Sequence, residues 1–198
     1  MYEELFENNK VVPVVVIKEV EDTLPTLQAM VRGGVNVAEI TFRTACAAEA
    51  IKLGREKLPD MCIGAGTVIN GEQCERAIAA GAQFIVGPGL SEEVALVCQK
   101  HGIPYLPGCV TPTEIMKALS LGYNIIKFFP AGVFGGLKAL KALSGPFPQV
   151  KFLPTGGADL SNLKEYLAFD KIIAVGGSWM MKGDIEANCR AITDLLNE

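Results

Sequence analysis

Short runs of hydrophobic, often β-branched residues recur along the whole chain, and each is followed by a turn and an amphipathic pattern with helical spacing. Apolar runs of about four to eight residues are typical of parallel strands buried on both faces, with helices as the crossover connections. We therefore predict eight strands, each followed by a helix: Val11–Ile17, Val35–Phe42, Met61–Gly64, Gln83–Gly87, Ile103–Pro107, Tyr123–Phe129, Val150–Pro154 and Lys171–Val175.

Capping residues mark where several of these helices begin and end. Thr111-Pro112-Thr113-Glu114 predicts a capping box with proline in the first helical position. Further N-caps are expected at Asn70, Ser91 and Ser161. Glycines in the position just after a helix are expected at Gly33-Gly34, Gly81, Gly102 and Gly122.

Eight similar strand–helix units in 198 residues predict a single α/β domain spanning residues 1–198, folded as a closed (β/α)8 TIM barrel. An open doubly wound sheet is the alternative, but such sheets usually stop at about five or six strands. The residues before Val11 predict a short N-terminal helix that covers the bottom of the barrel.

Composition and charge narrow the class of protein. The chain is 49% hydrophobic with a formal net charge of −4, and it contains no run of like charges. It therefore lacks the basic surface typical of nucleic-acid or membrane-surface binding. No apolar stretch approaches the ~20 residues that cross a bilayer, and the polar segment Met1 to Lys10 lacks a secretory core. We expect a cytoplasmic protein.

The cysteines and the single histidine argue against a metal centre. The six cysteines are scattered without a Cys-x-x-Cys pair, so we interpret them as reduced and structural. His101 is the only histidine, and it lies at the end of a predicted helix, away from the catalytic end of the strands. We expect no zinc and no cofactor; magnesium held by oxygen atoms alone stays open.

Lys127 is the most informative of the polar residues near strand ends. It lies in Ile125-Ile126-Lys127-Phe128-Phe129-Pro130, a strand pattern that is otherwise hydrophobic. Burial disfavours the charged ammonium form, and a neutral amine attacks carbonyl carbon. The alternatives are a lysine that extends to solvent and one that forms a core ion pair. We predict that Lys127 is a catalytic, Schiff-base-forming residue.

Glu39 is the predicted partner of Lys127. By strand alternation it shares a face with Val35, Val37 and Thr41. If that face points inward, its carboxylate lies near Lys127 and can move protons as water leaves and as a hydroxyl is deprotonated. A structural Lys–Glu pair without chemistry is the alternative, although such a pair is a weak source of stability.

Two glycine pairs and one arginine complete the candidate site. Pro154-Thr155-Gly156-Gly157 and Gly176-Gly177-Ser178 follow strands 7 and 8, where barrels bind phosphate through backbone N–H groups. Two tight turns are the alternative. Arg43, just beyond strand 2, has a planar fork that suits a carboxylate, and Thr67 lies on a glycine-rich turn after strand 3. A surface arginine and an N-cap threonine are the alternative there.

Taken together, these stretches resemble the family of 2-keto-3-deoxy-6-phosphogluconate (KDPG) and 4-hydroxy-2-oxoglutarate (KHG) aldolases. The resemblance runs in order over nearly the whole chain, and Lys127-Phe128-Phe129-Pro130 with Pro154-Thr155-Gly156-Gly157 is highly specific to that family. Further matching stretches are Val11–Lys18, Gly33–Val35, Glu39–Thr44, Gly64–Val68, Gly87–Leu90, Pro107–Glu114, Gly145–Pro148 and Gly176–Trp179.

The resemblance implies a role for each matching position. Lys127 would form the imine and Glu39 would be the general acid and base, while Arg43 and Thr67 would bind the carboxylate of pyruvate. It also implies a homotrimer without cofactors, acting on small 2-keto acids. The implied contacts of the distal phosphate are Gly156, Gly157, Gly177 and Ser178, with Thr155 and Pro88 lining the pocket.

One position departs from part of the family. Some members have an arginine at the end of strand 1, where this sequence has Val16, with Lys18 two residues on and Asp159 close after the first glycine pair. The departure bears on how strongly the distal phosphate is held. Besides the aldolase, two other interpretations stay open: a phosphosugar isomerase or epimerase with Glu39 as the carbon base, and a non-catalytic ligand-binding barrel.

Overall fold

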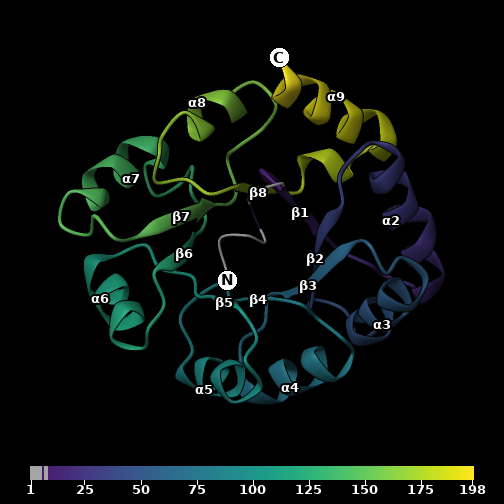
Figure 1. Ribbon diagram of the computed structural model, residues 1–198, viewed down its shortest axis with the longest axis horizontal. Coiled ribbons are helices and arrows are strands. Elements are labelled where there is room, and N and C mark those ends of the chain that lie inside the picture. Colours follow the sequence, from purple (N-terminus) through teal and green to yellow (C-terminus); the bar gives the residue numbers. More distant parts are fainter. Residues whose placement is uncertain (1–5, 7–8) are drawn as a thin grey trace.

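The computed structural model describes Phe6 and residues 9–198, and it has parallel strands at the centre with helices packed around them (Figure 1). Within the described residues the eight expected strands are present in order. They are β1 (Val11–Val15), β2 (Val37–Thr41), β3 (Cys62–Gly66), β4 (Ile85–Val86), β5 (Tyr105–Leu106), β6 (Ile125–Phe128), β7 (Lys151–Pro154) and β8 (Val175–Gly177).

The strands pair in two parallel sheets. Six of them form one sheet in the order β5-β4-β3-β2-β1-β8, and β6 pairs with β7 in the second. Single bridges connect the two sheets: Gly108, just beyond β5, pairs with Lys127 of β6, and Thr155, just beyond β7, pairs with Gly176 of β8. The chain is therefore an α/β protein whose strands bring their carboxyl ends to one face.

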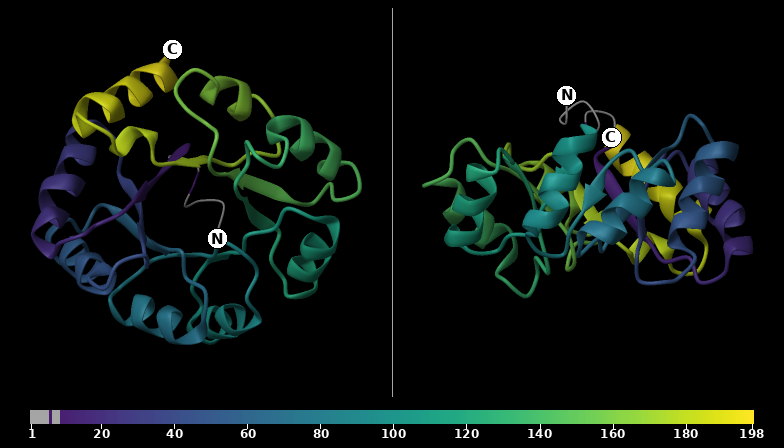
Figure 2. Two further views of the ribbon diagram at one scale, coloured as in Figure 1. Left: turned by 180° about the vertical axis from the view of Figure 1, so that it is seen from behind. Right: turned by 90° about the horizontal axis from the view of Figure 1, so that it is seen from below.

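Helices follow the strands and form the outer layer, which Figure 2 shows from behind and from below. The α-helices are α2 (Thr23–Arg32), α3 (Ala47–Lys57), α4 (Gly71–Ala79), α5 (Glu92–His101), α6 (Pro112–Ser120), α7 (Gly136–Ser144), α8 (Leu163–Leu167) and α9 (Ile185–Asn197). Short 3-10 turns are present at η1 (Val20–Asp22) and η2 (Trp179–Met181).

The predicted helix caps are confirmed with one exception. Thr111 and Glu114 form the expected capping box at α6, and the side chains of Asn70 and Ser91 cap α4 and α5. Ser161 was the wrong N-cap, because α8 begins after Asn162. The hydroxyl of Ser161 instead donates to the carboxylate of Asp159 at 2.5 Å.

The boundary of the last strand differs from the prediction. The sequence places this strand at Lys171–Val175 and the glycines after it, whereas β8 is Val175–Gly177 and pairs in parallel with Val11, Val12 and Pro13 of β1. A glycine-rich stretch is not predicted as a strand, because glycine has no side chain to pack and weakens a strand interior. Here close neighbours occupy the space that a side chain would need, as described below.

Aromatic packing fills the amino-terminal end of the interior, by which we mean the space that the strands surround. Phe84, directly before β4, is fully buried and contacts Phe6 edge-to-face with ring centroids 6.1 Å apart. Gly64 of β3 makes room for the Phe84 ring, which a side chain there would overlap. The expected N-terminal helix falls largely on residues outside those described.

Two further predictions concern the chain as a whole. The six cysteines are free thiols, and Cys74 and Cys98 are buried with sulfur atoms 3.5 Å apart between α4 and α5. Across the described residues, none of the helices combines the length and the apolar character that a membrane span requires.

Candidate active site

Lys127 and Glu39 meet in the interior. The Nζ atom of Lys127 lies 3.1 Å from Oε1 and 3.5 Å from Oε2 of Glu39, and the two side chains are only 4% and 0% exposed. Strands β6 and β2 are not neighbours in the sheets, so the side chains reach one another across the interior. The structure thus brings together the two residues that alternation places on inward faces.

This ion pair is poorly suited to a purely structural role. Removing two charges from water costs free energy that their attraction repays only partly, so a buried pair adds little net stability. The amine of Lys127 also lies 5.4 Å from the centre of the Phe129 ring, which shields it and attracts its positive form. Buried amine and carboxylate groups in contact are the arrangement expected for nucleophilic and acid–base chemistry.

A glycine leaves room for the carboxylate of Glu39. Gly66 ends β3, and a Cβ atom there would overlap Oε1 of Glu39 and lie 2.5 Å from its Cγ. Gly66 pairs in register with Thr41, two residues beyond Glu39, so the Glu39 side chain leans toward the carboxyl ends of the strands. A side chain at position 66 would displace the carboxylate from Lys127.

Backbone hydrogen bonds fix the position of Lys127. Its N–H donates to the carbonyl of Pro107 at 2.9 Å, and its carbonyl accepts from the N–H of Cys109 at 2.9 Å. Together with the pairing of Lys127 with Leu153, these bonds hold both edges of β6 at this residue. The amine therefore projects from a rigid strand, as a catalytic group requires.

Arg43 and Thr67 also come together. The Nε–H of Arg43 donates to the hydroxyl of Thr67 at 3.1 Å, and both residues follow the carboxyl ends of their strands. The backbone of Thr67 is left-handed, with φ 56°. Among the described residues, Thr67 is the one non-glycine residue with a positive φ. Such strain in a β-branched residue is concentrated at functional sites. Arg43 is exposed, and this bond uses only its Nε atom, so its two terminal nitrogens remain available for a ligand.

The turn after β7 has the features of an anion site. Gly156 and Gly157 have φ of 81° and 92°, and their carbonyls accept from Gly132 N–H at 2.8 Å and from the Asn162 side chain at 3.2 Å. Within the described part of the chain, neither glycine N–H forms a hydrogen bond. Two consecutive unused N–H groups in a glycine turn are a recurrent anion-binding arrangement.

The glycines of β8 serve a different purpose. A side chain on Gly176 would overlap the hydroxyl of Thr155, and one on Gly177 would overlap the ring of Trp179. Thr155 is buried and pairs with Gly176, so the two predicted glycine regions adjoin. Ser178 follows at the start of η2 with an exposed side chain that does not cap the turn.

Pro88 lies on the loop after β4, which a buried tyrosine holds in place. The hydroxyl of Tyr105 donates to the Gly89 carbonyl and accepts from the Ser91 N–H, both at 3.2 Å. Burial raises the pKa of this phenol well above its ordinary value, so it stays protonated as a donor. The loop borders a pocket of about 200 Å³ lined by Val68, Ile69, Pro88, Gly89, Leu90 and Ser91.

The remaining polar candidates lie outside this group. Lys18 is exposed, and Val16 at the end of β1 is 42% exposed. The Asp159 carboxylate accepts from the hydroxyl and N–H of Ser161, and these bonds lower the pKa of Asp159. His101 lies 2.8 Å from Glu75 on the surface. Among the described residues, no three His, Cys, Asp or Glu side chains are grouped to hold a metal.

Three residues near Lys127 and Glu39 were given no role in the predicted site. Gly66 provides room for Glu39, Phe129 covers the amine of Lys127, and Thr41 is buried beside Glu39 on the same strand face. Strand alternation could have placed Phe129 and Thr41 on the inward faces, because each lies two residues from Lys127 or Glu39. The role of Gly66 additionally required the register of β2 against β3.

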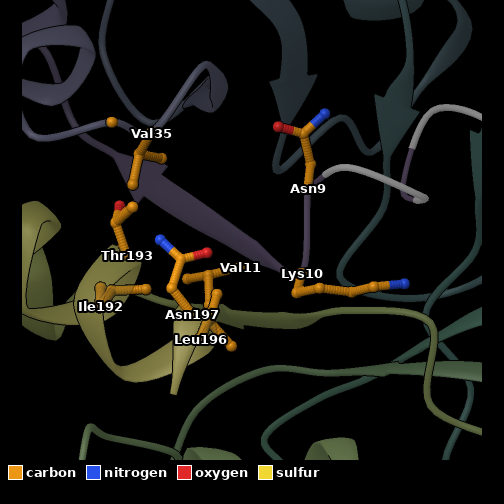
Figure 3. Close-up of a pocket in the computed structure, with 9 residues that line it drawn as sticks. Asn9, Lys10, Val11, Val35, Ile192, Thr193, Leu196 and Asn197 are labelled. Atoms are coloured by element: carbon orange, nitrogen blue, oxygen red, sulfur yellow. The ribbon is translucent and has the colours of Figure 1, made fainter.

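A separate pocket of about 250 Å³ lies between the start of β1 and the end of α9 (Figure 3). Lys10, Val11 and Val35 border it together with Ile192, Thr193 and Asn197. Lys10, Val11 and Val35 lie at or before the amino-terminal ends of β1 and β2, the end opposite Arg43 and Thr67, and the other three residues belong to α9. This pocket therefore contains none of the predicted site residues.

Comparison with known proteins identifies a family with this arrangement. The family model for KDPG and KHG aldolase matches residues 2–195. A 2-dehydro-3-deoxy-phosphogluconate aldolase of Treponema pallidum is 47% identical over 178 residues, covering 90% of this chain and 85% of the relative. The KHG/KDPG aldolase of Escherichia coli is 43% identical over 182 residues, with coverage of 92% and 85%.

Solved structures have the same fold. A KDPG aldolase from Legionella pneumophila, with pyruvate captured at low pH as a covalent carbinolamine intermediate, superposes with a TM-score of 0.90 at 45% identity. The match covers 98% of this chain and 96% of that one. A 2-keto-3-deoxy-6-phosphogluconate aldolase from Zymomonas mobilis superposes with a TM-score of 0.91 at 38% identity, covering 96% and 94%.

Proposed function

This chain belongs to the KDPG and KHG aldolase family, and on that premise we propose that Lys127 forms the Schiff base through which it acts. The observation that carries this assignment is the 3.1 Å contact between the buried amine of Lys127 and the buried carboxylate of Glu39. A lysine nucleophile needs a neighbouring group that accepts and returns protons, and Glu39 is in reach.

The reaction follows from this pair. The Lys127 amine attacks the C2 ketone of a 2-keto-4-hydroxy acid, and Glu39 protonates the C2 hydroxyl so that it leaves as water. The resulting iminium accepts the electrons of the C3–C4 bond when the C4 hydroxyl is deprotonated, and an aldehyde departs. Protonation at C3 and hydrolysis then release pyruvate and regenerate the free lysine.

Two substrates fit this chemistry, and they differ beyond C4. KDPG would yield pyruvate and glyceraldehyde 3-phosphate, whereas KHG would yield pyruvate and glyoxylate. We assign the shared carboxylate to Arg43 and Thr67, whose side chains already form a hydrogen bond. The distal phosphate is assigned to Gly156, Gly157, Gly177 and Ser178, with Thr155 and Pro88 lining the pocket. The unused N–H groups of the glycine turn support that assignment.

The remaining predictions about the whole molecule stay proposals. We propose that the strands close into a (β/α)8 barrel, which the single bridges at Gly108 and Thr155 support. The family match over residues 2–195 supports one catalytic domain. A homotrimer and a cytoplasmic location remain our expectations from the family resemblance and from the sequence.

Borohydride reduction in the presence of pyruvate tests the central assignment. We expect a single pyruvyl-sized adduct in the intact-protein mass spectrum, mapped to the peptide that contains Lys127 and absent from Lys127→Met. Lys18→Met is the matched control, because Lys18 is an exposed lysine near the end of β1, and it should leave the adduct unchanged. No adduct, or an adduct on another lysine, would favour the isomerase or ligand-binding alternatives.

A further inference from the structure

Thr41 carries a buried hydroxyl that has no partner within the described residues. It is the last residue of β2, its exposed fraction is 0%, and its Oγ1 forms no hydrogen bond there. Buried hydroxyl groups are nearly always hydrogen-bonded, because the lost contact with water is otherwise uncompensated. An unsatisfied hydroxyl at a strand end therefore requires an explanation.

The position of Thr41 points to the catalytic pair. Glu39 and Thr41 lie two residues apart on one strand, so their side chains share a face, and Glu39 on that face reaches Lys127. The carboxylate of Glu39 leans over Gly66, and Gly66 is the register partner of Thr41. The hydroxyl of Thr41 and the carboxylate of Glu39 therefore lie at the same level of the interior, at its carboxyl end.

Stability does not account for a threonine at this position. Valine has the same shape and a higher preference for a buried strand, and it would leave no polar atom unsatisfied. The Thr41 hydroxyl thus adds no hydrogen bond to the fold within the described residues. A polar group without a partner in the fold is typical of functional sites, where local rules are broken for the sake of a ligand.

We propose that Thr41 contacts the substrate, its hydroxyl forming a hydrogen bond with the C2 oxygen of the keto acid bound at Lys127. This inference rests on the proposed function. The C2 oxygen is attached to the carbon that bonds Nζ, so it lies beside the Glu39 carboxylate. Arg43 and Thr67 already bind one another and are assigned to the carboxylate of the substrate. The C2 oxygen is the reacting group that still needs a second partner.

A hydroxyl suits each form that the C2 oxygen takes. It donates to the ketone, and attack by the amine with one proton moved from nitrogen to oxygen gives the carbinolamine. Glu39 then gives a proton to the C2 hydroxyl, the C–O bond breaks with its electrons, and the nitrogen lone pair forms the C=N bond. The departing water accepts from Thr41, and the reverse steps use a water held in the same place.

Exchange of the C2 oxygen of pyruvate with ¹⁸O-labelled water isolates these steps, because it needs no aldehyde. We expect Thr41→Val to slow enzyme-catalysed exchange and aldol cleavage by about 100-fold, as for loss of one donor to a reacting oxygen. Its melting temperature should equal or exceed that of the parent protein. Thr41→Ser should restore most of the exchange, which a purely structural role would not predict.

The chain provides a matched control. Thr23, the first residue of α2, is also fully buried with an Oγ1 that lacks a partner in the described part of the chain, but it lies in the outer layer. Thr23→Val should leave exchange unchanged. If Thr41→Val folds poorly, Thr41→Ala fits the same space and should show the same loss of exchange.

The adduct and the exchange rates together distinguish a failure of the Thr41 proposal from a failure of the Lys127 assignment. Unchanged exchange in Thr41→Val or Thr41→Ala, with a pyruvyl adduct on Lys127 in the parent protein, would overturn the role of Thr41 alone. A loss of exchange accompanied by a lower melting temperature, without recovery in Thr41→Ser, would also overturn it. Failure of the parent protein to form the adduct would instead refute the assignment of Lys127.

Discussion

The two glycine pairs look alike in the sequence, yet they meet different physical requirements. Gly156 and Gly157 have positive φ angles, so glycine is needed there for the path of the backbone. Gly176 and Gly177 lie in strand β8 with ordinary strand pairing, and glycine is needed because Thr155 and Trp179 occupy the adjoining space. Within the described residues, neither N–H group of the first pair forms a hydrogen bond, so the turn leaves both groups available to an anion.

Glycine is therefore required for backbone conformation in the turn after β7 and for close packing in β8. The two reasons differ in their response to substitution, because asparagine tolerates a left-handed backbone but is larger than alanine. Asparagine should therefore partly replace glycine in the turn after β7, and it should be worse than alanine in β8.

The largest expected effect is that of Gly177→Ala. The new methyl group would overlap the Trp179 ring, and relief requires movement of β8 against β1, so we expect a loss of about 3 kcal/mol. Chemical denaturation measures this free energy of unfolding. Gly89→Ala is the control, because Gly89 has open space around its Cβ position, and it should change stability by less than about 0.5 kcal/mol. If the stability loss of Gly177→Ala were as small as that of Gly89→Ala, the Trp179 ring would have to move aside at little cost.

Gly156→Ala should have a smaller effect. Its nearest neighbours are 3.4 Å or more from a new methyl group, so the cost is that of the positive φ alone, about 1–2 kcal/mol. Gly156→Asn should recover part of this loss in the same denaturation experiment. If Gly156→Asn were less stable than Gly156→Ala, side-chain crowding and not backbone conformation would be the reason for this glycine.

Ser178→Ala should change substrate preference with little change in stability, because the side chain is exposed. If Ser178 donates to a phosphate, its loss should raise KM for KDPG by about 10-fold, the value of one hydrogen bond to a charged group. KM for KHG, which has no phosphate, should stay the same. Steady-state kinetics of Ser178→Ala with both substrates measures the two KM values. An equal rise in KM for KDPG and KHG would contradict the assignment of Ser178 to the phosphate.

The smallest effect concerns Asp159, beside the first glycine pair. Hydrogen bonds from Ser161 lower the pKa of Asp159 below its ordinary 3.8. These bonds therefore stabilise the folded protein fully at any pH above 3.8, where Asp159 is ionised in the folded and unfolded states. The stabilisation is lost as the pH falls through the pKa of Asp159 in the folded protein. The difference in melting temperature between the parent protein and Asp159→Asn should be constant near neutrality and shrink below pH 3.8. Ser161→Ala should make this melting-temperature difference depend less on pH. If the pH dependence were unchanged, the hydrogen bond from the Ser161 side chain would not be its cause.

Local sequence patterns predicted the strands and most helix caps, because periodicity and capping depend on near neighbours. They also placed Lys127 and Glu39 on inward faces, although the two are 88 positions apart. They misplaced the end of β8, since the need for Gly176 and Gly177 comes from Thr155 and Trp179 after folding. The role of Gly66 likewise depended on strand register, which no short segment encodes.

The single bridges that connect the two sheets have a consequence for how the enzyme fails. Two of the three isolated bridges include a candidate site residue, Lys127 or Thr155, and the third pairs Phe152 with Ile172 ahead of β8. The connection of β6 to β5 is therefore limited to the bridge at Lys127 and the backbone hydrogen bonds beside it. Separation of the strand pair β6–β7 from β5 would withdraw the amine from Glu39 before most of the core is exposed. Turnover should therefore fall before bulk unfolding begins, and activity would act as an early gauge of damage to this part of the molecule.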